Sequence, residues 1–155
     1  MLTKEQKITN YETLNHISGV RDLITLIVIE LLKRAENHDK SKLESPELEY
    51  FTKYTKLLKD VEYESDEYKQ LKEELKPALD HHFANNSHHP EHYKNGINDM
   101  NLVDIIEMLC DWKDSSSRNK GGNIRKSLEI NAKKFGISDQ LLKILENTVD
   151  LLFSS

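Results

Sequence analysis

The histidines of this sequence are concentrated in one short segment. Five of the seven lie between His81 and His92, and the other two are His16 and His38. Neutral imidazole is the commonest side-chain metal ligand, and divalent first-row metals need several nitrogen and carboxylate ligands that converge on one point. The clustering therefore favours a metal site, while a polar, histidine-rich surface loop is the alternative reading.

Three acidic residues could complete such a site. Asp39 directly follows His38, so the pair offers a nitrogen and a carboxylate that can bridge two metals. Asp111 lies in the apolar stretch DIIEMLCDW, where a carboxylate is costly to bury unless it is paired, hydrogen-bonded or bound to a cation. Glu107, one helical turn earlier, could accept a hydrogen bond from a ligand histidine. An exposed position on the helix is an equal alternative for Asp111 and for Glu107.

Helices are needed to bring these residues together. The chain has five glycines, three prolines and no strand-like alternation, which predicts helix almost throughout. A long helix over about 11–35 places His16 on the same apolar face as Val20 and Leu23. A lone histidine on such a face is usually an ordinary core residue, and a metal ligand is the alternative.

The remaining elements follow from capping and stop signals. Thr3 with Gln6 predicts a short first helix, Ser45-Pro46 a helix to about 59, and Ser65 a helix to about 85 that kinks or restarts at Pro77. Further helices are expected over about 101–115, 124–135 and 139–153, with an ordered loop over 86–101 and a flexible stretch SSRNKGGN. We predict an all-α fold, a single compact bundle of six or seven helices that spans residues 1–155.

Composition excludes several classes of function. The formal net charge is -5 with both signs interleaved, which argues against general nucleic-acid binding. The one cysteine, Cys110, excludes an intrachain disulfide. The N-terminus does not resemble a secretory signal, and the apolar run Leu23–Ile29 is too short to span a membrane. We expect a cytoplasmic protein.

A local excess of positive charge follows Asp111. Between Lys113 and Lys134 the chain carries seven lysines and arginines against two acidic residues. The segment is either a solvated surface or a cationic rim beside an anion-binding site.

The order of His16, His38-Asp39 and Asp111 along the chain resembles the H…HD…D signature of the HD-domain superfamily. This resemblance implies a helical fold in which these four side chains bind divalent metal, most often in a phosphohydrolase. Lys42 stands where many HD domains carry a lysine, in HDxxK. The segment DHHFANNSHHPEHY resembles the additional histidines of HD members that hold two metals.

A closer resemblance connects the stretches HDKSKLESPE, NNSHHPEHY and DIIEMLCDW to a small uncharacterised family of bacteria and phages. Its pattern points to His82, Asn86, His88 and His89 rather than to His81 or His92. The GYP tripeptide of the cyclic-dinucleotide subgroup is absent, so such a substrate is not supported.

These observations favour a metal-dependent phosphohydrolase that acts on a small anionic substrate, such as a nucleotide or related phosphoester. The expected cofactor is one or two divalent ions of Mn, Fe, Ni, Co or Zn. The expected metal ligands are His16, His38, Asp39, His82, His89 and Asp111. Catalytic roles fall to Asp39, to Lys42 as the phosphate ligand and to His88 as a proton donor. A di-iron oxygenase of the HD type and a non-catalytic, metal-stabilised binding module are the alternatives, and the oligomeric state stays open.

Overall fold

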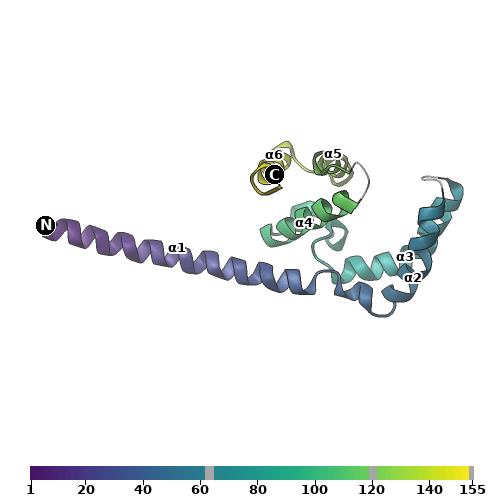
Figure 1. The fold of residues 1–155 in the computed structure, drawn as a ribbon, viewed down its shortest axis with the longest axis horizontal. Helices are drawn as coiled ribbons and strands as arrows, with labels where there is room; N and C mark the ends of the chain where they lie inside the picture. The colour runs from purple at the N-terminus through teal and green to yellow at the C-terminus, as the bar shows by residue number, and fades with distance from the viewer. Residues whose placement is uncertain (62–64, 119–121, 154–155) are drawn as a thin grey trace. The chain divides into compact units, whose positions relative to one another are not determined.

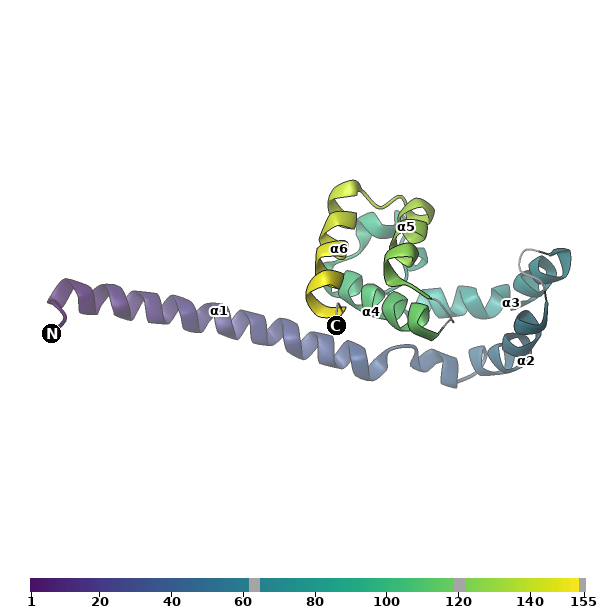
Figure 2. The same ribbon diagram turned by 45° about the horizontal axis from the view of Figure 1, so that its top comes forward.

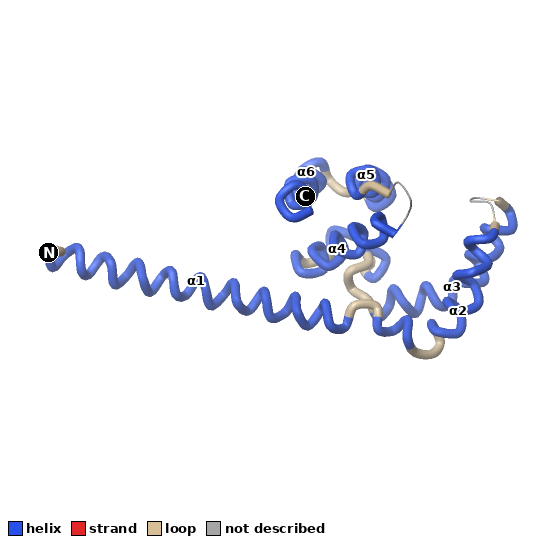
Figure 3. Tube along the Cα trace, in the orientation of Figure 1, coloured by secondary structure: helices blue, strands red, loops and turns tan. Residues whose placement is uncertain are grey.

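The computed structural model describes residues 1–61, 65–118 and 122–153, and these residues form an all-α fold without strands (Figures 1 and 3). The predicted fold class is thus confirmed. The α-helices are α1 (Lys4–Asn37), α2 (Glu47–Asp60), α3 (Asp66–Asn85), α4 (Leu102–Arg118), α5 (Ile124–Phe135) and α6 (Asp139–Phe153). Short 3-10 helices are η1 (Lys40–Leu43), η2 (Pro90–His92) and η3 (Gly96–Asp99).

The chain divides into two compact units, Met1–Asn37 and His38–Ser155. The first unit is the helix α1, which starts at a reciprocal capping box. The Thr3 amide donates to Gln6 Oε1 (2.9 Å) and the Gln6 amide donates to Thr3 Oγ1 (3.2 Å). The cap was predicted, but the separate short helix was wrong, because no glycine or proline interrupts the chain before residue 19. None of the side chains of α1 is buried.

In the second unit, α2 and α3 lie side by side (Figures 1 and 2) and pack through Tyr54, Leu75 and Ala78. Ser65 caps α3 by accepting a hydrogen bond from the Tyr68 amide (3.1 Å). The helix continues through Pro77 without the predicted restart. Helix α2 begins after Pro46 without a side-chain cap, so the predicted cap at Ser45 was wrong by one residue.

Helices α4, α5 and α6 form a second apolar cluster, centred on Met108, Leu128 and Leu145. The predicted limits of α5 and α6 are confirmed. Gly136 stops α5 in the left-handed region (φ 63°), which glycine adopts without steric cost. Ser138 Oγ accepts a hydrogen bond from the Leu141 amide at the start of α6 (3.3 Å).

Asp104 connects the histidine-rich loop to α4. Its buried carboxylate accepts hydrogen bonds from Ser87 Oγ (2.8 Å), Tyr93 OH (2.7 Å) and the Asn101 amide (3.2 Å). In return, the Asp104 amide donates to Asn101 Oδ1 (3.1 Å), so the two residues together cap α4. The predicted flexible stretch SSRNKGGN includes residues 119–121, which lie outside the described residues.

None of the helices, over the residues described, has the length and apolar character needed to cross a membrane.

Candidate metal centre

Asp39 is the geometric centre of the site. It lies between α1 and η1 in the left-handed backbone region (φ 57°), which aspartate tolerates better than most residues. The Lys42 amide donates to the Asp39 carbonyl (2.9 Å) and Lys42 Nζ donates to Asp39 Oδ2 (2.6 Å). This turn directs the two carboxylate oxygens of Asp39 toward two different groups of side chains.

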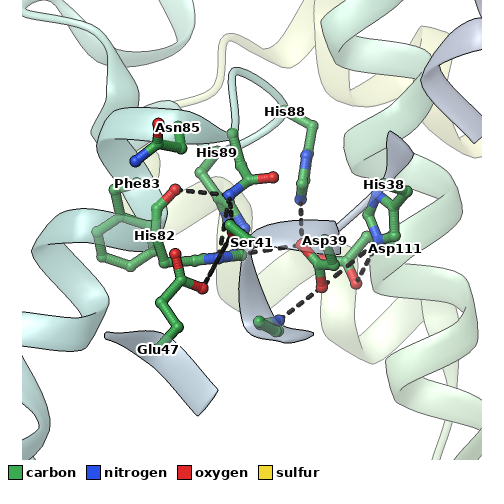
Figure 4. Close-up of polar contacts among 12 residues, drawn as sticks. His38, Asp39, Ser41, Glu47, His82, Phe83, Asn85, His88, His89 and Asp111 are labelled. Carbon is green, nitrogen blue, oxygen red and sulfur yellow. Dashed lines mark hydrogen bonds and ion pairs between the residues drawn. The ribbon is translucent and has the colours of Figure 1, made fainter. Parts of the chain in front are cut away.

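The first group surrounds Asp39 Oδ1 (Figure 4). His82 Nε2 lies 3.3 Å and His88 Nε2 3.5 Å from this oxygen, and the Nε2 atoms of His82 and His89 are 2.9 Å apart. All four residues offer a ligand atom within 4.8 Å of the others. Adjacent ligands of a tetrahedral metal with bonds of about 2.1 Å stand about 3.4 Å apart, so the spacing suits one ion.

The second group surrounds Asp39 Oδ2. His38 Nε2 lies 3.7 Å from this oxygen and 3.9 Å from Asp111 Oδ1. These three residues also satisfy the 4.8 Å spacing. In Figure 4, Asp39 lies between the His82 and His88 rings on one side and His38 with Asp111 on the other. Asp39 could therefore bridge two ions.

Glu107 contacts one histidine of each group. Its Oε1 atom lies 2.9 Å from His38 Nδ1 and 3.2 Å from His88 Nδ1. The hydrogen bond expected from a histidine to this residue is present. A carboxylate only accepts hydrogen bonds, so both rings carry a proton on Nδ1. In their neutral forms they present an Nε2 lone pair toward Asp39, as metal-binding histidines do.

The carboxylates of Asp39 and Glu107 are ionised at neutral pH. Burial raises the pKa of Asp39, but the adjacent His82 and Lys42 outweigh this effect and hold it well below its usual range. Burial likewise opposes ionisation of Glu107, yet hydrogen bonds from His38 and His88 lower its pKa to about 2. Negative charge thus gathers around the converging imidazoles and favours a cation.

The histidine pKa values differ in direction. The hydrogen bond to Glu107 raises the pKa of His38 above its ordinary 6.5, against the opposing effect of burial. Burial, and then the nearness of His88 and His82, lowers the pKa of His89 to about 3. His89 therefore keeps an available lone pair at neutral pH.

Two buried atoms at the centre have no hydrogen-bond partner among the described residues, and these are Asp39 Oδ1 and His88 Nε2. They face each other at 3.5 Å. With the His88 proton on Nδ1, both atoms are acceptors, and an unpaired buried acceptor costs about 1–3 kcal/mol. A cation between them would satisfy both lone pairs, so the donor set fits a divalent metal ion.

The structure brings together most of the residues named from the sequence. His38, Asp39, His82, His88, His89 and Asp111 converge in the second unit. His16 is an exposed residue of α1, in the first unit, and its role as a ligand stays a prediction. His92 is exposed, and its Nδ1 donates a hydrogen bond to the Phe83 carbonyl (2.7 Å).

Three of the six described basic residues in the segment after Asp111 form ion pairs with acidic side chains. Arg118 pairs with Asp114, Arg125 with Asp150, and Lys134 with Glu91 at 3.0 Å. Lys120, which belongs to the same segment, lies outside the described residues. These ion pairs favour the solvated-surface interpretation over a cationic rim.

The sequence interpretation missed Glu47, whose side chain is fully buried beside His81 and His82. It follows Pro46 in an amphipathic helix and looks like an ordinary acidic residue of a first helical turn. Its contacts with histidines more than thirty positions away leave no local sign in the sequence.

Comparison with known proteins gives a family and no activity. The model of a family of unknown function, DUF5662, matches residues 5–151. No curated protein and no solved structure matches the chain.

Proposed function

Because the chain belongs to the DUF5662 family, whose function is unknown, we propose an activity from the site itself: metal-dependent hydrolysis of a small phosphoester. The observation that carries the proposal is the pair of buried, unpartnered acceptors Asp39 Oδ1 and His88 Nε2. A cation held between them would pair with the ionised carboxylate and with the imidazole lone pair. The resemblance of the sequence to the HD-domain signature supports phosphoester hydrolysis as the reaction.

Two divalent ions held on either side of Asp39 would supply Lewis-acid and water-activating chemistry. The side chains around Asp39 differ in their exposure to solvent. His82 and His88 are buried, with side chains 2% exposed, whereas His38 (30%), Asp111 (23%) and Lys42 (38%) reach solvent. A substrate would approach from the exposed side, where Lys42 offers a positive charge for the phosphate.

Lys42→Ala is expected to raise KM about ten- to hundredfold while the metal content stays unchanged. The lysine contributes a charged hydrogen bond of about 1.5–3 kcal/mol and is not a metal ligand. Steady-state kinetics with the metal-replete protein measures the effect. Lys76→Ala is the matched control, because Lys76 pairs with Asp80 (2.6 Å) at an exposed position of α3. An unchanged KM would remove Lys42 from the substrate site.

Metal affinity is expected to rise with pH. An imidazole must be neutral to bind a metal. The pKa of His38 is raised above its ordinary value of 6.5, so its ring stays protonated to a higher pH. Below the raised pKa, each displaced proton weakens binding by about tenfold per pH unit. The carboxylates with lowered pKa do not compete in this range. Titration with Co²⁺ between about pH 6 and about pH 8 measures the slope, and a flat profile would exclude His38 as a ligand.

Elemental analysis of protein purified without an affinity tag, followed by a phosphate-release screen, tests the function. The screen covers nucleoside mono-, di- and triphosphates and phosphodiesters with Mn²⁺, Co²⁺, Ni²⁺, Zn²⁺ and Fe²⁺. We expect one or two metal ions per chain and release of phosphate from at least one substrate. Two irons that consume dioxygen without phosphate release would favour an oxygenase. Metal-replete protein inactive in both assays would favour a binding module.

A further inference from the structure

The buried carboxylate of Glu47 contacts polar side chains. Its side chain is 0% exposed at the first position of α2. Oε1 lies 2.7 Å from His81 Nδ1, and Oε2 lies 2.9 Å from His82 Nδ1 and 3.0 Å from Ser41 Oγ. Both oxygens of a fully buried carboxylate are therefore engaged by side chains that converge from η1 and α3.

The donors in this network can be assigned one by one. Asn86 Nδ2 lies 2.8 Å from Ser41 Oγ, 2.8 Å from the His82 carbonyl and 3.1 Å from His82 Nδ1. Its two hydrogens are used by the two shorter contacts, so it has none left to donate to His82 Nδ1. Ser41 Oγ accepts from Asn86 and donates its own proton to Glu47. His82 Nδ1 remains as the second donor to Glu47 Oε2, because an ionised carboxylate can only accept.

This assignment determines what His82 presents to the site. With its proton on Nδ1, the neutral ring has an Nε2 lone pair, and that atom faces Asp39 Oδ1 at 3.3 Å and His89 Nε2 at 2.9 Å. Figure 4 shows Glu47 on the side of His82 remote from Asp39. Glu47 thus accepts a hydrogen bond from Nδ1 of His82, as Glu107 does from Nδ1 of His38 and His88.

We propose that Glu47 is a positioning residue, which fixes the tautomer and the ring orientation of His82 so that Nε2 points at Asp39. The part of this proposal that concerns metal affinity rests on the proposed metal centre. The tautomer is a property of the protein without metal. Carboxylates placed behind ligand histidines typically contribute ten- to hundredfold in metal affinity.

A purely structural role would be charge stabilisation at the N-terminus of α2. Glu49 lies in the same first turn of α2 but is exposed. It is therefore also near the helix N-terminus, and it lacks the histidine contacts. Methionine has nearly the length of glutamate and cannot accept these hydrogen bonds. Glu47→Met and Glu49→Met therefore form a matched pair that separates the two roles.

The first experiment is ¹⁵N NMR of the imidazoles in the metal-free, full-length protein, at a pH where His82 is neutral. We expect the Nδ1–H tautomer of His82 in the wild type and in Glu49→Met. In Glu47→Met the proton should move to Nε2, where Asp39 Oδ1 can accept it. An Nε2–H tautomer in the wild type would overturn the proposal, whether or not the variants fold.

The second experiment is titration of the same proteins with Co²⁺. Glu47→Met should lower the affinity about ten- to hundredfold, and Glu49→Met should stay within about twofold of the wild type. Equal losses in both variants would overturn the positioning role in favour of a helix-terminus effect. Loss of the Nδ1–H tautomer in Glu47→Met, combined with no Co²⁺ binding by the wild type, would support Glu47 as a positioning residue and refute the metal centre.

Discussion

Replacing Asp39 by asparagine is expected to remove metal binding at both groups and to lower the hydrolytic rate by at least about three orders of magnitude. Asparagine keeps the shape of aspartate and tolerates the left-handed backbone (φ 57°), so the fold should survive. It removes the charge that both ligand groups share. Elemental analysis and steady-state kinetics of the purified variant measure the two effects.

The control for Asp39 is Asp80→Asn. Asp80 also pairs with a lysine, Lys76, at 2.6 Å, but its side chain is 60% exposed on α3. This control should keep the wild-type metal content and rate, since an exposed ion pair contributes at most about 1 kcal/mol. Wild-type metal content in the Asp39 variant would contradict the bridging role and, with it, the proposed centre.

The double variant His82→Ala, His89→Ala is expected to lose the ion of the first group and to keep that of the second. The two Nε2 atoms lie 2.9 Å apart and form one side of the first group, whereas His38 and Asp111 belong to the second. Metal content should fall from two ions to one. Metal analysis combined with anomalous scattering from crystals of the loaded variant would show which ion remains.

His92→Ala is the matched control for the histidine variants. It removes a histidine of the same segment that belongs to neither ligand group and whose exposed ring contacts the Phe83 carbonyl and the Tyr93 ring. Its metal content should equal that of the wild type. An unchanged content in the double variant would instead show that His82 and His89 serve the substrate or the fold.

The ends of several helices were predictable because residues next to those ends determine where each helix starts or stops. Ser138 and Gly136 define the ends of α6 and α5, and the cap of Asn101 on Asp104 opens α4 where expected. Pro77 did not act as a breaker, since the surrounding helix is packed against α2 through Leu75 and Ala78. Tertiary packing outweighs the lost backbone hydrogen bond there.

The candidate site was predictable to the extent that its chemistry is rare. Clustered histidines and an aspartate within an apolar stretch are unusual enough to be noticed one at a time, and their order along the chain suggested that they meet. Glu47 and the second role of Asp104 were missed because glutamate and aspartate are common in first helical turns. Only the fold reveals that one is buried against His81 and His82 and the other holds Ser87 and Tyr93.

The division of the second unit into two apolar clusters, one between α2 and α3 and one among α4, α5 and α6, has a consequence for folding cooperativity. His82 belongs to the first helix pair, whereas Asp111 and Glu107 belong to α4. Ions bound at Asp39 would tie the clusters together and add about 2.7 kcal/mol of stability at a free concentration one hundred times Kd. A chelator would then do more than lower the melting temperature: it would broaden the unfolding transition, because the two clusters would lose the ions as a link and stay coupled through the hydrogen bonds to Asp104 and Glu107.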